Sequence, residues 1–407
     1  AGAGRLGAGP TGPRAIGRTG AGRAPEARRT AGCGADIGYC SPAAVAAAGA
    51  APARRVLGLG SDGSATYAIA GVRTEAREVV GVLRAGERTV LLVGGDPPRR
   101  AGLAAAARIA AATGARVLCE TFPTRMERGA GIPAVERLAY FAEAAAAQLD
   151  GSKHLVLAGA KSPVSFFAYP GMPSDLVPAG CEVHVLAGHT GAADALSALA
   201  DQLAPGTPAP VAAASRPALP TGPLTSASAA DVIGALLPER AIVVDESNTS
   251  GVLLAQATAG APAHDWLTLT GGAIGYGIPA AVGAAVAAPD RPVLCLESDG
   301  SAMYTISGLW TQARENLNVT TVLYDNSAYD ILRIELQRVG AGSAPGPEAL
   351  SLLDLSDPAM DFVKISEGMG VPARRVSTAE EFADALRAAL AEPGPHLIDA
   401  VVPSIAG

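Results

Sequence analysis

Residues 292–328 read PVLCLESDGSAMYTISGLWTQARENLNVTTVLYDNSA, and this stretch decides the fold class of the 407-residue chain. The apolar runs Val293–Leu296 and Thr321–Tyr324 predict two buried strands, because strands covered on both faces are almost continuously hydrophobic. The residues between them have the composition of a helix. Strand, helix and strand in this order predict part of a doubly wound parallel sheet in an α/β protein.

Polar residues follow both strands directly. Asp299 and Gly300 come after the first strand, and Asn326 comes after the second. The carboxyl ends of parallel strands meet at one edge of a sheet, where ligands bind, so Asp299 and Asn326 are expected to share a hard cation such as Mg²⁺. We expect Gly300 to allow a sharp turn into a helix whose first N–H groups bind a phosphate. The pattern predicts a diphosphate anchored through Mg²⁺.

The same alternation of strands and helices extends over residues 225–407, which predicts one α/β domain. Further strands are expected at Ala241–Val244, Trp266–Leu269 and His396–Val402, and a helix at Thr378–Leu390 behind a cap at Ser377. Residues 205–224 contain six prolines and no acidic residue, which is typical of a semi-rigid linker between domains.

A second, central α/β domain is predicted at residues 67–204. Its expected strands are Thr89–Val93, Arg116–Cys119, His154–Ala158 and Glu182–Leu186, and its expected helices are Leu103–Ala112, Val135–Leu149 and Ala192–Leu203. Residues 1–66 consist mostly of Ala, Gly, Arg, Pro and Thr, and we interpret them as a disordered or aberrant leader.

Composition excludes several classes of protein. A net charge of -7 and a pI near 5.4 argue against nucleic-acid binding, which needs concentrated Lys and Arg. The five cysteines form no CxxC pair, so neither a disulfide framework nor a cysteine metal site is expected. No long apolar stretch or signal peptide is present in the sequence, which favours a cytoplasmic protein that does not bind membranes.

The stretch from Asp299 to Asn326 resembles the metal-diphosphate motif of thiamine diphosphate enzymes, above all the acetolactate synthase large subunit and its relative benzoylformate decarboxylase. GGAIGYGIPAAVGAA (271–285) is similar to the glycine-rich segment that precedes this motif in the family. The resemblance is close over about residues 240–335 and looser over 70–407.

The resemblance implies thiamine diphosphate and Mg²⁺ as cofactors. The implied metal ligands are Asp299, Asn326 and the carbonyl of Ala328. The implied cofactor-binding residues are Asn248, Thr249, Gly272, Ile274, Gly300, Ser301 and Ala302. Among these, Ile274 would lie under the cofactor and hold it bent, and the Gly272 carbonyl would accept from the aminopyrimidine.

The function implied by the resemblance is condensation of two 2-oxo acids, with pyruvate as substrate and CO₂ as a product, in branched-chain amino acid biosynthesis. A homo-oligomer is implied as well, because active sites of the family form between subunits. The first alternative is a 2-oxo acid decarboxylase of the benzoylformate type, since YTISGLW and ESNTS look closer to that branch. No flavin signature is found between residues 70 and 205.

The sequence departs from the family pattern in three respects. Ser298 stands where the family usually has Gly, which should be tolerated, and Asp325 stands where it usually has Asn, which adds negative charge near the metal. The domain that supplies the family's activating glutamate is not recognised upstream, so no catalytic residue is named. A catalytically inactive cofactor-binding or regulatory module is therefore the second alternative.

Other features have plainer interpretations. The segment Gly58–Gly63 matches a dinucleotide fingerprint but lacks the acidic residue that should follow, so nicotinamide binding is not expected. We interpret His154, His184 and His396 as packed neutral imidazoles, and His264 as the histidine nearest the predicted site. The strand-end carboxylates Glu246 and Glu297 are expected to cap neighbouring helices.

Overall fold

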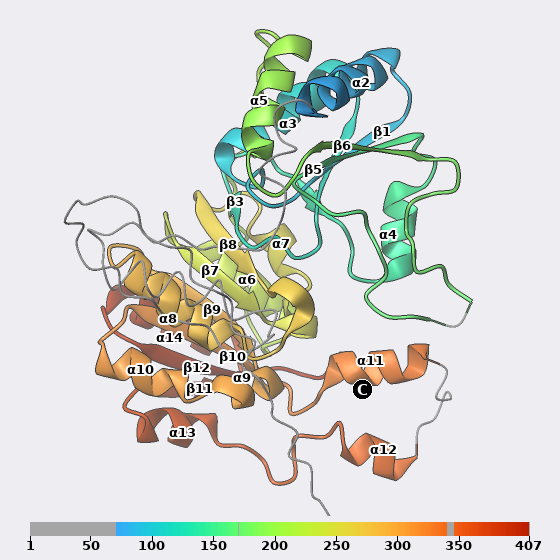
Figure 1. Ribbon diagram of the computed structural model, residues 1–407. Helices are drawn as coiled ribbons and strands as arrows, with labels where there is room; N and C mark the ends of the chain where they lie inside the picture. The colour runs from blue at the N-terminus through green and yellow to red at the C-terminus, as the bar shows by residue number, and fades with distance from the viewer. Residues whose placement is uncertain (1–70, 170, 340–345, 407) are drawn as a thin grey trace, which may run out of the picture.

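The computed structural model describes residues 71–169, 171–339 and 346–406, which form two α/β units, each around its own sheet (Figure 1). The predicted α/β class with doubly wound parallel sheets is confirmed. The leader predicted at residues 1–66 and the fingerprint at Gly58–Gly63 lie outside the described residues.

The first unit is a five-stranded parallel sheet with the strand order β4-β2-β1-β5-β6. Its strands are β1 (Thr89–Val93), β2 (Arg116–Cys119), β4 (Glu136–Arg137), β5 (His154–Ala158) and β6 (Glu182–Ala187). Helices α2 (Gly71–Ala85), α3 (Arg100–Thr113) and α5 (Ala192–Leu203) pack on one face, and α4 (Ala142–Leu149) packs on the other.

Strand β1 shows why this sheet is covered on both faces. All five of its residues are buried. Successive side chains of a strand point to opposite faces. Leu91 and Val93 accordingly join the core under α2, α3 and α5, whereas Val90 and Leu92 join the core under α4.

The second unit is a seven-stranded sheet with the order β11-β12-β10-β9-β7-β8-β3. Its strands are β3 (Met126–Arg128), β7 (Ile242–Glu246), β8 (His264–Thr268), β9 (Val293–Ser298), β10 (Val319–Asp325), β11 (Ala373–Val376) and β12 (His396–Val401). Six of them are parallel, and β3 pairs antiparallel with β8.

Helices cover both faces of the second sheet as well. Helices α6 (Ser226–Leu236) and α14 (Ala379–Ala391) pack on one face. The other face carries α8 (Gly277–Ala287), α9 (Asp299–Thr305), α10 (Gly308–Arg314) and α13 (Phe362–Gly368). The remaining short elements are η2 (Asn248–Gly251), α7 (Leu254–Ala257), η3 (Thr270–Gly272), α11 (Asp330–Arg338) and α12 (Pro347–Ser351). No helix in the described ranges is long and apolar enough to cross a bilayer.

Two of the predicted helices begin elsewhere. The helix expected at Val135–Leu149 begins only at Ala142, because the residues before it form β4, which pairs with the edge of β2. The cap of α14 is Thr378, not Ser377: the Thr378 side chain accepts from the Glu381 N–H, and the Glu381 carboxylate reaches back to the Thr378 N–H.

Strand β3 was missed by the sequence analysis, and it carries a chain segment of the first unit into the second sheet. Met126 pairs with Trp266, and the guanidinium of Arg128 lies 5.1 Å from the centroid of the Trp266 ring. Beside β3, the guanidinium of Arg125 donates to both carboxylate oxygens of the buried Asp265, at 2.7 and 3.1 Å. These contacts fix the first unit against β8.

We expect Trp266 to be a main anchor of this junction. Its side chain is 1% exposed, and its indole N–H donates to Asp245 at 3.0 Å. Trp266→Ala should lower the free energy of unfolding by about 3 to 5 kcal/mol, because a large cavity forms and Asp245 loses a donor. Urea unfolding followed by circular dichroism measures the change. Trp310→Ala is the matched control: Trp310 is 53% exposed, and its loss should cost less than about 1 kcal/mol. Equal losses in the two variants would contradict this role.

Candidate cofactor site

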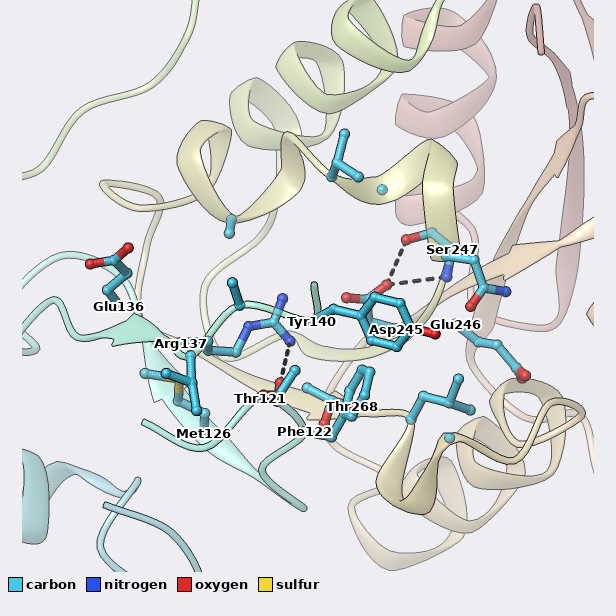
Figure 2. Close-up of a pocket in the computed structure, with 18 of the residues that line it drawn as sticks. Thr121, Phe122, Met126, Glu136, Arg137, Tyr140, Asp245, Glu246, Ser247 and Thr268 are labelled. Carbon is cyan, nitrogen blue, oxygen red and sulfur yellow. Dashed lines mark hydrogen bonds between the residues drawn. The ribbon is translucent and has the colours of Figure 1, made fainter. Parts of the chain in front are cut away.

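A cavity of about 1130 Å³ lies between the two units. Four of the predicted cofactor-binding residues line it, namely Asn248, Thr249, Gly272 and Ile274. The first unit forms the opposite wall with Phe122, Arg137 and Tyr140. Figure 2 shows these side chains across the cavity from Asp245 and Ser247 of the second unit. Helix α11 closes part of the rim.

Asn248 joins this cavity to the serines on either side of Asp299 and Gly300. It sits directly after β7 with a positive φ of 47°, and its amide nitrogen donates to the hydroxyl oxygens of Ser298 and Ser301, at 3.0 and 3.1 Å. Asp245 fixes the turn that carries Asn248, because it accepts from the backbone N–H and the hydroxyl of Ser247. The loop after β7 is thus bonded to the start of α9.

Asp299 and Asn326 lie side by side, as the strand-end rule predicts. Asp299 is buried, and its two oxygens accept from the N–H groups of Gly300 at 2.7 Å and Asn326 at 3.1 Å. Burial raises the pKa of Asp299 to about 7, and the charge of Asp325 acts in the same direction. The amide oxygen of Asn326 accepts from the N–H of Ala328, so the three residues that would supply the predicted metal ligands form one cluster.

Sequence reasoning missed Asp330, which orients Asn326. The carboxylate of Asp330 accepts from the amide nitrogen of Asn326 at 3.1 Å and from the Ser404 hydroxyl at 2.6 Å. Because the nitrogen of Asn326 is engaged in this way, its oxygen is the end that can bind a cation, through the lone pair that the Ala328 N–H does not use. Carboxylate, amide and carbonyl oxygens are hard ligands, so the cluster fits Mg²⁺.

Both local departures from the family pattern are accommodated. Ser298 has an ordinary extended conformation (φ −98°), and its hydroxyl donates to the Glu246 carbonyl at 2.8 Å, which confirms that a side chain is tolerated there. The added carboxylate of Asp325 lies 3.5 Å from the guanidinium of Arg375, which also binds Asp399. Arg375 therefore offsets part of the extra negative charge.

Glycines and two buried carboxylates build the segment 271–277. Gly271, Gly272 and Gly275 have φ values of 77°, 69° and 89°, a region that favours glycine. Glu246 accepts from the N–H groups of Gly275 and Gly277, at 2.7 and 2.5 Å, and so caps the start of α8 as expected. A Cβ at position 277 would clash with the carboxylate of Glu297.

The Glu246 and Glu297 carboxyl groups form a buried pair. Burial raises the pKa of both, and that of Glu297 is raised further by the charge of Glu246. Backbone N–H groups act against this rise at both carboxylates: those of Gly277 and Gly275 at Glu246, and those of Ser298 and Ile278 at Glu297. Ile278 lies in the first turn of α8, so Glu297 also contributes to capping that helix, as expected.

Gly300 is needed for a different reason than predicted. It lies inside α9 and is not among the described glycines with a positive φ, so no sharp turn requires it. A Cβ there would clash with the ring of Tyr329, so the ring occupies the space that the glycine leaves open. Of the two following residues, Ser301 bonds to Asn248, whereas Ala302 packs its methyl group into the core under α8 and α10.

His264 does not line the cavity. It is buried against the ring of Trp266, and its Nδ1 bonds to the Pro262 carbonyl at 2.7 Å. Burial, together with the nearby charge of Arg128, lowers its pKa to about 4. His264 is therefore a packed neutral imidazole rather than part of the site.

Comparison with known proteins agrees with the family resemblance of the sequence. Residues 249–400 match the model of the family described as thiamine pyrophosphate enzyme, C-terminal TPP binding domain. A Mycobacterium tuberculosis protein named "Putative acetolactate synthase large subunit IlvX" is 76% identical over 383 residues, covering 92% of this chain and 74% of that protein. The chain belongs to the thiamine pyrophosphate (thiamine diphosphate) enzyme family.

Other members of this family are similar over shorter stretches. Benzoylformate decarboxylase of Pseudomonas aeruginosa is 35% identical over 268 residues, covering 62% of this chain and 49% of that enzyme. The solved structure of a thiamine diphosphate-dependent 4-hydroxybenzoylformate decarboxylase from Rhodococcus jostii RHA1 superposes with a TM-score of 0.68 at 25% identity, covering 87% of this chain and 67% of that one. The chain thus spans from about half to three quarters of the length of these relatives.

The low pKa of His264 predicts a loss of stability in acid. Between about pH 6.5 and pH 4 the unfolded chain binds a proton at this imidazole that the folded chain does not, so unfolding becomes easier as the pH falls. The contribution should be on the order of 2 kcal/mol at about pH 5. We expect His264→Phe to reduce the difference in urea midpoint between about pH 7 and pH 5, with His396→Gln as control. An unchanged pH dependence in His264→Phe would contradict the assignment.

Proposed function

We propose that this chain is a thiamine diphosphate- and Mg²⁺-dependent enzyme of the acetolactate synthase type, which condenses 2-oxo acids, with pyruvate as substrate, and releases CO₂. The family membership supplies the cofactor class. The observation that carries the proposal is the cluster of Asp299, Asn326 and Ala328, which lies beside Ser298 and Ser301, the two residues that accept from Asn248 at the cavity.

Asp299, Asn326 and the Ala328 carbonyl would hold Mg²⁺. The buried Asp299 accepts two backbone N–H groups but has no positive partner among the described ion pairs, so a bound cation would stabilise its ionised form. Asp330 would hold the amide oxygen of Asn326 in the ligating position.

The residues beside this cluster would hold the diphosphate. Asn248, Thr249, Gly300, Ser301 and Ala302 surround the start of α9 and the turn after β7, where backbone N–H groups and hydroxyls are the available donors. Anions bind at such helix starts because the first N–H groups of a helix have no partner within it.

Gly272 and Ile274 would position the rest of the cofactor. Both residues line the cavity, and the Ile274 side chain is 40% exposed although it is apolar. An apolar side chain exposed in a cavity offers a surface on which a thiazolium or pyrimidine ring can pack. Glu246 holds the backbone of this segment in place through Gly275 and Gly277.

Bound thiamine diphosphate supplies a nucleophilic carbon and an electron sink for the decarboxylation of 2-oxo acids. The protein's part is to orient the reactants and to exclude water. Phe122, Tyr140 and Phe166 form an aromatic wall with ring centroids 5.2 to 6.2 Å apart, and this wall faces the cavity from the first unit. Burial also raises the pKa of Tyr140, so its hydroxyl stays protonated and able to donate.

The same wall favours the second candidate function, decarboxylation of an aromatic 2-oxo acid of the benzoylformate type. Aromatic side chains that pack edge to face can accept a further ring. The likeness to benzoylformate decarboxylase and to 4-hydroxybenzoylformate decarboxylase supports this candidate.

The third candidate is a catalytically inactive cofactor-binding module. Assembly as a homo-oligomer and a cytoplasmic location remain part of the proposal.

Removing the Asp299 carboxylate should abolish Mg²⁺-dependent cofactor binding. We expect Asp299→Ala to weaken the affinity for thiamine diphosphate in the presence of Mg²⁺ by more than about 100-fold, because a ligand of the metal is lost. Calorimetric titration, repeated with a chelator, measures this change. Asp384→Ala, which removes an exposed carboxylate on α14, should bind as the unchanged chain does. Equal affinity in the Asp299→Ala variant would show that the cluster does not hold the metal.

Product analysis separates the candidate reactions. Incubation of the full chain with thiamine diphosphate, Mg²⁺ and pyruvate should give acetolactate. Incubation with benzoylformate should give little benzaldehyde if the acetolactate synthase type is correct. Benzaldehyde as the main product would favour the decarboxylase. Cofactor binding without turnover of either substrate would favour the inactive module.

A further inference from the structure

Two histidines and three glutamates meet at the edge of the first sheet where its strands begin. His154 is the first residue of β5, and the neighbouring strand β6 contributes Glu182 and His184. Glu78 of α2 and Glu87, which follows α2, lie against the two imidazoles. The candidate cofactor site belongs to other elements, since its cavity is lined by residues that follow strands β2 and β7.

The two imidazoles point one nitrogen each at the same spot. Nδ1 of His154 lies 3.1 Å from Nε2 of His184. One carboxylate oxygen of Glu182 lies 3.7 Å from the first nitrogen and 3.9 Å from the second. These three atoms come from three different side chains, and all lie within 4.8 Å of one another.

This spacing is close to that of a metal's ligands. With zinc–nitrogen bonds of about 2.0 to 2.1 Å, two ligands of a tetrahedral zinc ion are about 3.3 Å apart. The two nitrogens are therefore already near the spacing that a zinc ion requires. The Glu182 side chain is 72% exposed, so it can move the few tenths of an ångström that are still needed.

The outer nitrogens have the partners that metal-binding histidines need. Nε2 of His154 lies 3.0 Å from the Glu87 carboxylate, and Nδ1 of His184 lies 3.5 Å from the Glu78 carboxylate. A histidine bound to metal through one nitrogen usually donates its other N–H to a carboxylate, which fixes the tautomer and makes the free nitrogen a better ligand. Both imidazoles can adopt this arrangement at once, and it leaves the two inner nitrogens as lone-pair donors.

The charge of the cluster also favours a cation. In the described part of the chain, none of the carboxylates of Glu78, Glu87 and Glu182 pairs with a lysine or an arginine. Three negative groups thus surround two largely buried imidazoles. A divalent ion between the inner nitrogens would offset this charge and would replace the hydrogen bond that the two rings otherwise share.

We propose that His154, His184 and Glu182 bind a divalent transition-metal ion of the zinc class, with Glu78 and Glu87 orienting the two histidines. Imidazole and carboxylate ligands suit zinc, whereas Mg²⁺ prefers oxygen ligands throughout, so this site differs in kind from the cluster at Asp299. The ion joins β5 to β6 directly and joins α2 to both strands through the outer carboxylates. Its role is structural, and water completes its coordination on the exposed side.

Titration of the full chain with Co²⁺, in the presence of excess Mg²⁺, tests this site. Tetrahedral Co²⁺ absorbs in the visible range, so we expect one equivalent to give a visible band that Zn²⁺ then removes. His184→Gln should abolish the band, and His396→Gln, the matched control, should keep it. A band that survives in His184→Gln, or that disappears in Asp299→Ala, would overturn the proposal. So would a near-ultraviolet thiolate band, which would assign the ion to cysteines.

A second readout keeps the test valid if His184→Gln folds poorly. Glu182→Gln changes an exposed side chain and should fold normally. Zn²⁺ should raise the melting temperature of the unchanged chain but not that of Glu182→Gln. Glu78→Gln should weaken Zn²⁺ binding about 10- to 100-fold, as changes of such orienting carboxylates usually do. Equal Zn²⁺ affinity in the unchanged chain, Glu182→Gln and Glu78→Gln would contradict the site.

Discussion

Burial of the Asp299 carboxylate at the end of β9 is the constraint around which the second unit is arranged. An ionised carboxylate loses its hydration when it is buried, and two backbone N–H groups replace only part of it, so the pKa rises. The neighbouring charge of Asp325 increases the cost of ionisation. Asp325 itself lies 3.5 Å from the guanidinium of Arg375. A protein that only needed a helix cap would not require this burial, whereas a cation site gains from a ligand that is held rigidly and shielded from water.

Strand register explains how distant residues reach this carboxylate. Glu246 pairs with Glu297, and Ser298 pairs with Tyr324, so the ends of β7, β9 and β10 lie next to one another. The loops after these strands carry Asn248, Asp299 and Asn326 to the same edge. Two of the four described non-glycine residues with positive φ, Asn248 and Ser327, lie in these loops. Backbone strain of this kind often marks functional sites, because regular structure elsewhere must hold it in place.

The sequence predicts those parts of the structure that depend on short stretches of chain. Continuous apolar runs identified β1 and β10, and the strand-end rule placed Asp299 beside Asn326. The sequence alone could not identify Asp330 as the partner of Asn326. Asp330 also accepts from Ser404, which is 74 residues away along the chain, so its position depends on the tertiary fold. Nor could the sequence predict β3, because three residues carry no periodic signal and the strand exists only through its pairing with β8. The sequence analysis interpreted His154 and His184 as packed neutral imidazoles. Both are buried, but only the register of β5 with β6 shows that their rings meet.

The cavity draws its two walls from different units, so the proposed cofactor contacts and the aromatic wall belong to separate parts of the chain. The proposed cofactor contacts come from loops of the second sheet. These loops contain the motif residues that were recognised in the sequence. The aromatic wall comes from the first unit, and the pairing of β3 with β8 and the contact between Arg125 and Asp265 hold it in place. On the far side, the hydroxyl of Tyr169 donates to the buried carboxylate of Glu335 on α11, at 2.8 Å. Under the proposed function, substitutions in the wall would change which 2-oxo acid fits while the cluster at Asp299 stays intact, because function depends on sites that vary within one fold.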